Sequence, residues 1–133
     1  MMAFSECRNR SYSINDLPPD YIVFGTGGGF ANQLESNYLL PNGQIIRTRS
    51  VGDVPVQVPA LKKKAARNIY RALEESGFRD LELNAPDNMY NFIAFVEHDE
   101  ELHRITWGFD AEVLPARVKA VQQMLWEAIS EGR

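Results

Sequence analysis

The feature that most constrains the fold of this chain is a run of glycines inside an apolar stretch. Residues 21–34 read YIVFGTGGGFANQL, with glycine at positions 25, 27, 28 and 29. A dinucleotide-binding fingerprint needs G-x-G-x-x-G between a strand and a helix. Here the sixth position is Phe30, and the residues after it alternate like a strand. The Gly-Lys step of a phosphate-binding loop is also missing, so the glycines predict no nucleotide site.

Two interpretations of the glycines remain open. In the first, the chain passes through a tight crossing or a bulge where side chains do not fit. Gly27, Gly28 or Gly29 then adopts a positive φ or lies where a Cβ would clash. In the second, bare backbone beside an aromatic ring enters the groove of a partner protein. The candidate binding residues are then Gly27, Gly28, Gly29 and Phe30.

The remaining pattern predicts an α+β fold in the order β-β-β-α-β-β-α. Strands are expected at residues 20–24, 30–40, 44–49, 89–98 and 102–109, and helices at 60–76 and from 115 onward. Hairpins dominate and no βαβ unit repeats, which favours an antiparallel sheet of about four or five strands with two helices packed on one face. Residues 1–19 are expected to form a flexible N-terminal arm, and residues 20–133 a single domain.

Local signals refine this order. Asn42-Gly43 predicts a tight turn, Gly77 a helix C-terminal cap, and residues 50–59 a long loop. The strand at 30–40 alternates, which predicts that every second apolar side chain faces one core. The expected members of that core are Phe30, Leu34, Tyr38, Ile69, Leu73, Phe92, Ile105, Val121 and Leu125.

Composition narrows the function classes. The chain has 133 residues, 14 basic and 18 acidic, and a net charge of −4. Nucleic acid is therefore not expected as a partner, because phosphate binding needs a basic face. No stretch reaches the ~18 apolar residues of a membrane span. No secretory signal is visible, so we expect a cytoplasmic protein as written, or a secreted or envelope protein if a leader was removed.

Residue types that commonly act in catalysis do not form a recognisable motif in this sequence. The single cysteine, Cys7, lies in the predicted arm, and His98 and His103 flank an acidic turn. We therefore expect no catalytic residues, no metal site and no cofactor. Five cations form a basic helix face, interpreted as a solvated surface or as a docking patch for an acidic partner. They are Lys62, Lys63, Lys64, Arg67 and Arg71.

Several short stretches also resemble a known family. They are Thr26-Gly27-Gly28-Gly29-Phe30-Ala31, Phe78-Arg79-Asp80-Leu81, PDNMYNFIAFVEH at 86–98, HRITWG at 103–108, and the pair Leu125 and Trp126. Together they span about residues 20–130 and resemble the emfourin-like family of small bacterial inhibitors of thermolysin-type metallopeptidases. They also resemble uncharacterised bacterial envelope proteins with a GSGGGF-type motif. The chain departs from the inhibitors in its longer, hairpin-like segment at 39–59 and in one additional glycine.

The resemblance implies a non-catalytic protein-binding domain with a metallopeptidase or another protein as partner. Gly27, Gly28, Gly29 and Phe30 would then make the first contacts. The alternative that it leaves open is a structural or ligand-holding bacterial envelope module.

Overall fold

The alternating apolar stretches of the chain pair into one mixed sheet. The computed structural model describes residues 11–29, 33–49, 54–108 and 110–130, and these form seven strands in the order β4-β3-β2-β1-β6-β7-β5. The strand bounds are β1 Tyr21–Gly28, β2 Gln33–Leu39, β3 Ile45–Thr48, β4 Val56–Val58, β5 Asn84–Ala85, β6 Met89–Glu97 and β7 Glu100–Trp107. Neighbouring strands are antiparallel except β5, which lies parallel to β7. The α+β prediction is confirmed, with more strands than expected.

The two additional strands are short and lie at the edges of the sheet. β4 occupies three residues of the segment predicted as a loop, and β5 occupies two residues for which neither a strand nor a helix was expected. Prolines flank them, with Pro55 and Pro59 beside β4 and Pro86 after β5. Because proline cannot donate a ladder hydrogen bond, it limits strand length and protects a sheet edge from further pairing.

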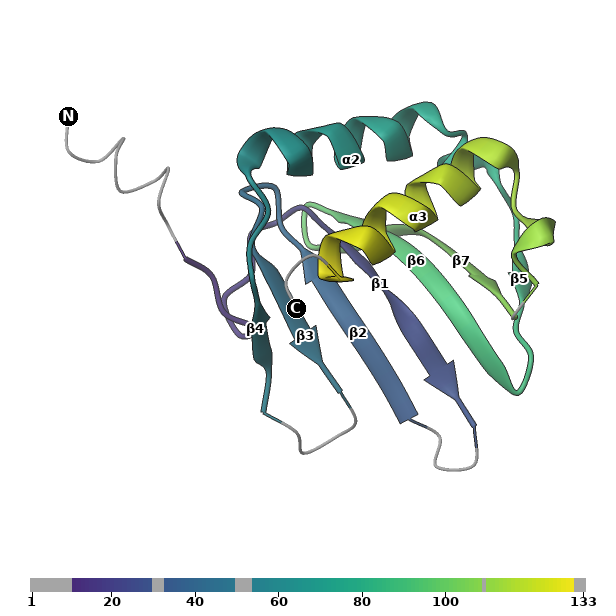
Figure 1. Ribbon diagram of the computed structural model, residues 1–133, viewed down its shortest axis with the longest axis horizontal. Helices are drawn as coiled ribbons and strands as arrows, with labels where there is room; N and C mark the ends of the chain where they lie inside the picture. The colour runs from purple at the N-terminus through teal and green to yellow at the C-terminus, as the bar shows by residue number, and fades with distance from the viewer. Residues whose placement is uncertain (1–10, 30–32, 50–53, 109, 131–133) are drawn as a thin grey trace.

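Two helices cover one face of this sheet (Figure 1). α2 runs over Lys63–Glu75 and α3 over Ala116–Ser130, and short 3₁₀ turns η1 (Phe78–Asp80) and η2 (Ala111–Val113) precede β5 and α3. Gly77 follows α2 with φ 83°, which confirms the predicted cap. The tight turn also occurs, because the N–H of Gly43 donates to Leu40 O at 2.9 Å.

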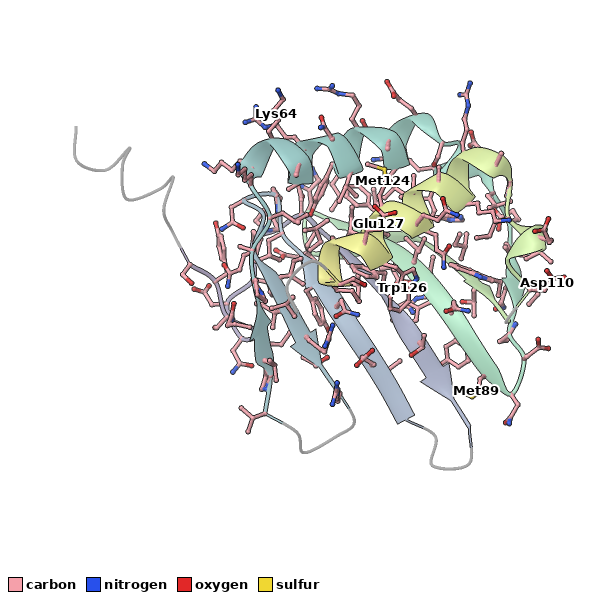
Figure 2. All side chains as sticks on the ribbon, viewed as in Figure 1. Lys64, Met89, Asp110, Met124, Trp126 and Glu127 are labelled. Atoms are coloured by element: carbon pink, nitrogen blue, oxygen red, sulfur yellow. The ribbon has the colours of Figure 1, made fainter. Side chains whose placement is uncertain are left out.

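The hydrophobic core lies between the helices and the sheet. The helices contribute buried side chains at intervals of three and four residues, which places them on one stripe. These are Ala66, Ile69 and Leu73 of α2, and Val118, Val121, Leu125, Ala128 and Ile129 of α3. The strands contribute Ile22, Phe24, Leu39, Ile45, Ile93, Phe95, Ile105 and Trp107. Trp126, at the sheet-facing edge of α3 (Figure 2), packs edge-on against Phe24 with ring centroids 5.7 Å apart.

The predicted face of β2 was wrong. Tyr38 packs on the opposite side of the sheet from the helices, in a cluster with Val23 and Phe92, and Leu34 is 45% exposed. The prediction that Phe92 joins the core under the helices was therefore also wrong. Phe30, expected in the same row as Leu34 and Tyr38, lies outside the described residues. The reason is the register: Ile22 pairs with Leu39 and turns it toward the helices, so its neighbour Tyr38 faces away.

We call the side of the sheet away from the helices the open face. It carries Tyr21, Val23, Leu34, Tyr38, Tyr90, Phe92 and Val96. Its β3–β4 end is covered by residues 11–19, where the side chain of Gln44 bonds both the N–H and the carbonyl of Tyr12, at 2.8 and 2.6 Å. That part of the predicted arm is therefore held against the sheet.

Candidate functional site

Each of the three glycines at 27–29 occupies a position that a side chain would disturb. A Cβ on Gly27 would lie 2.5 Å from the hydroxyl oxygen of Tyr90. Gly28 has φ +95°, and its Cβ would lie 2.0 Å from the carbonyl oxygen of Asn88. Gly29 has φ +82°, its Cβ would only touch Met89 Cγ at 3.8 Å, and its N–H donates to the same carbonyl at 2.9 Å. The prediction of positive φ or a steric clash is confirmed.

The first two of these glycines belong to strand β1 itself, and Gly29 follows its end. We had expected all three to lie in a connection between two strands. β1 extends through Gly28, and its residues pair on both sides, with Gly27 opposite Leu34 of β2 and Tyr90 of β6. The bare backbone at Gly27 allows the Tyr90 ring to lie across β1. We call this end of the sheet the glycine-turn surface, formed by Gly27, Gly28, Gly29, Leu34, Met89 and Tyr90.

Apolar side chains on the glycine-turn surface are exposed. Leu34 on the open face is 45% exposed, and Met89 on the helix side is 44% exposed. Both lie next to the glycines, because Gly27 pairs with Leu34 and Gly28 pairs with Met89. Figure 2 shows Met89 at the end of the sheet remote from α2. Phe30, the fourth predicted site residue, lies outside the described residues.

Tyrosines continue this surface along the open face. Tyr21 and Tyr38 have ring centroids 5.7 Å apart, and Tyr90 packs on the same cluster of Val23 and Phe92. The three hydroxyls make no hydrogen bond to any described residue. Burial raises the pKa of the Tyr21 phenol, and nearby acidic groups raise it further, so the ring carries no charge at neutral pH. Half-buried tyrosines of this kind are enriched at protein interfaces.

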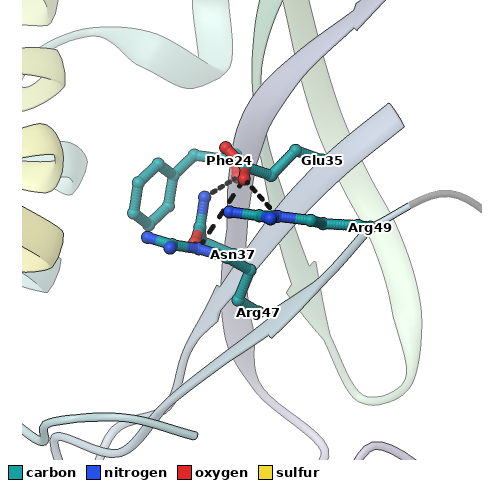
Figure 3. A network of polar contacts seen from close by, with 5 residues as sticks. All are labelled: Phe24, Glu35, Asn37, Arg47 and Arg49. Atoms are coloured by element: carbon teal, nitrogen blue, oxygen red, sulfur yellow. Dashed lines mark hydrogen bonds and ion pairs between the residues drawn. The ribbon is translucent and has the colours of Figure 1, made fainter. Parts of the chain in front are cut away.

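The helix side of β2 carries a polar network in place of the predicted apolar row (Figure 3). The fully buried Asn37 donates from Nδ2 to Phe24 O at 3.3 Å and accepts at Oδ1 from Arg47 Nε at 3.0 Å. Glu35 accepts from Arg49 Nε at 3.1 Å. Arg47 and Arg49 share the carboxylate of Glu35, at 3.9 and 3.1 Å, so the network ties β2 to β3.

A cavity of about 290 Å³ opens between α2, η1 and β6. Its walls are Tyr70, Leu73, Phe78 and Phe95, and charged side chains stand at its rim. Sequence reasoning missed this cavity, because only folding brings β6 against the consecutive segments α2 and η1.

Of the predicted basic face, only Arg71 lines the cavity, and neither histidine lines it or belongs to the glycine-turn surface. His103 bonds Leu81 O through a ring nitrogen at 2.7 Å and packs edge-on against Phe78, while His98 lies exposed at the β6–β7 turn. Across the described ranges, no group of three or more His, Cys, Asp or Glu side chains is placed to hold a metal ion. The cations at 62–64 are exposed. Cys7 lies outside the described residues.

Comparison with known proteins adds no family: no protein-family model matches the chain, and no curated protein is significantly similar to it. Of the helices in the described part of the chain, none has the length and apolar character needed to span a bilayer. The function must therefore be inferred from the geometry.

Proposed function

We propose that this chain is a non-catalytic protein-binding domain that contacts its partner through the glycine-turn surface. The observation that supports the proposal is the exposed apolar pair, Leu34 and Met89, on either side of a bare glycine backbone. Exposed apolar side chains beside aromatic rings are typical of interface cores.

The geometry of the turn suits recognition. Gly28 and Gly29 have positive φ. Gly28 pairs with Met89 in the sheet, and the N–H of Gly29 donates to Asn88 O, so contacts within the domain order the backbone of these two residues. A preorganised surface loses little conformational entropy on binding. Tyr90 adds a hydroxyl that no described residue uses.

For the partner we propose a thermolysin-type metallopeptidase, inhibited by the bound domain. The support is the resemblance of residues 26–31 and 86–98 to the emfourin-like inhibitors. The alternative, a structural or ligand-holding envelope module, requires no peptidase partner.

The test is an inhibition titration against a panel of thermolysin-type metallopeptidases, with a serine peptidase as control. Leu34→Ser is compared with Leu102→Ser, which removes the same side chain from a strand position of nearly equal exposure, 44%, on β7. We expect one peptidase to be inhibited, with affinity lowered about tenfold or more by Leu34→Ser, as for a contact at an interface centre. Leu102→Ser should leave inhibition unchanged. Phe30→Ala should weaken it as well.

Two results would oppose the proposal. Inhibition of no peptidase in the panel would remove the metallopeptidase partner and favour the envelope module. Equal loss of inhibition in Leu34→Ser and Leu102→Ser would show that binding does not involve the glycine-turn surface.

A further inference from the structure

The cavity under α2 has an almost wholly apolar interior. Tyr70 and Leu73 line it from α2, Phe78 from η1 and Phe95 from β6. The rings of Tyr70 and Phe95 meet edge-on, with centroids 6.3 Å apart. An apolar cavity of ~150 Å³ accepts one benzene ring. This cavity, at about 290 Å³, has room for a fused pair of rings or for one ring with a short chain.

The interior offers no free hydrogen-bonding group. The only polar side-chain atom of its four wall residues is the hydroxyl of Tyr70, which donates to Leu39 O at 2.5 Å. Burial raises the pKa of this hydroxyl well above its usual value, so it remains a neutral donor at physiological pH. A polar group on the buried part of a ligand would lose its water without replacement. The enclosed part of a ligand must therefore be apolar.

The charged side chains at the rim of the cavity favour a negatively charged ligand. Arg79 lies over the Phe95 ring at 5.3 Å and is held between Glu74 at 3.2 Å and Glu97 at 3.8 Å. Arg71, the other cation of the rim, makes no ion pair or hydrogen bond with any described residue. Of the charges that line the cavity, only this exposed guanidinium has no partner, and it can accept one carboxylate.

We infer that the cavity binds a small carboxylic acid with an aromatic body, its ring enclosed by Tyr70, Phe78 and Phe95 and its carboxylate paired with Arg71. None of the residues that line the cavity belongs to the glycine-turn surface. Leu34 and Tyr90 of that surface lie on the open face, and Met89, on the helix side, lies at the end of the sheet remote from α2 (Figure 2). This site is therefore independent of the proposed partner surface.

Three probes that share one ring system test the inference by calorimetric titration of the full chain. They are 1-naphthoate, neutral 1-naphthalenemethanol and cationic 1-naphthylmethylammonium. We expect 1-naphthoate to bind most tightly and the cation most weakly. Arg71→Gln should weaken 1-naphthoate about fivefold, the upper range for a partly exposed ion pair, and should leave the neutral probe unchanged.

Arg67→Gln is the matched control, because Arg67 lies one turn earlier on α2, is also exposed and does not line the cavity. It should leave all three affinities unchanged. Amide shifts on adding 1-naphthoate should centre on residues 70–79 and 95. The inference is overturned if none of the probes binds at millimolar concentration or if the shifts centre elsewhere. It is equally overturned if the preference for the carboxylate persists in Arg71→Gln, or if Arg67→Gln weakens 1-naphthoate to the same extent.

Discussion

Replacing Gly28 with alanine should destabilise the protein more than the same change at Gly77. The two glycines have similar positive φ angles, +95° and +83°. They differ in their surroundings, because a Cβ on Gly28 would lie 2.0 Å from Asn88 O, whereas a Cβ on Gly77 would have no atom within 4 Å. The pair therefore separates the cost of the clash from the cost of the dihedral angle.

The expected magnitudes follow from these contacts. A left-handed conformation costs an alanine ~1–2 kcal/mol, and restricting the unfolded chain returns ~0.4–1 kcal/mol in both variants. Gly77→Ala should therefore cost about 1 kcal/mol. At Gly28 the backbone must also move away from Asn88, which breaks the hydrogen bond from Gly29 N–H and adds ~0.5–1.5 kcal/mol. With the residual overlap, Gly28→Ala should cost roughly 2–4 kcal/mol.

Urea denaturation of the unsubstituted protein, Gly77→Ala and Gly28→Ala measures both losses of stability. Thermal melting provides a second measurement, with a shift in melting temperature of about 4 °C per kcal/mol for a chain of this length. If Gly28→Ala unfolds at the same urea concentration as Gly77→Ala, the close approach of Asn88 to the glycine is not real. The steric explanation of the glycine run would then be wrong.

Further variants test other contacts. Tyr70→Phe leaves the Leu39 carbonyl without its donor and should lower the free energy of unfolding by ~1–2 kcal/mol; an unchanged value would show that water replaces the hydroxyl. The unfolded chain loses the Tyr70 proton near pH ~10, whereas the folded chain retains it to higher pH because burial raises its pKa. The contribution of Tyr70 to stability should therefore be constant below pH ~10 and fall above it. The fall should be smaller in Tyr70→Phe, as measured by denaturation at several pH values. Asn37→Leu removes the acceptor of Arg47 and should cost ~1–3 kcal/mol, whereas a stabilised variant would mean that the pair opposes folding. Leu125→Ala opens the core under α3 and should cost ~2–5 kcal/mol; a loss below 1 kcal/mol would contradict its full burial.

The helices and their faces could be predicted from the sequence because their pattern has one solution. Ile69 and Leu73 repeat at helical spacing, as do Val121 and Leu125, and all four are buried against the sheet. A helix has one apolar stripe, and burying it determines the orientation. The Asn42-Gly43 turn and the Gly77 cap were also predictable, because each depends on a local conformation that glycine favours.

The face of β2 could not be predicted from its own sequence. One row holds Leu34, Ser36 and Tyr38, and the other holds Glu35, Asn37 and Leu39, so both faces mix apolar and polar side chains. Pairing with β1 decides which row faces the helices. The buried Asn37 is tolerated because Phe24 O and Arg47 satisfy its amide.

In the candidate sites, too, some features could be predicted from the sequence and others could not. The conformations of Gly28 and Gly29 could be predicted, since three adjacent glycines are costly unless the geometry requires them. The neighbouring Met89 was not identified, because its position beside Gly28 arises from the pairing of β1 with β6. β4 and β5 were missed because strands of three and two residues are too short to show a period.

Amide hydrogen exchange of the protein, alone and mixed with each metallopeptidase of the panel, tests the proposed partner surface most directly. The account predicts that at least one mixture slows exchange in peptides spanning residues 27–34 and 87–90, while the amides of α2 and α3 exchange as in the free protein. Unchanged exchange at the glycine turn in every mixture, or protection centred on the helices, would contradict it.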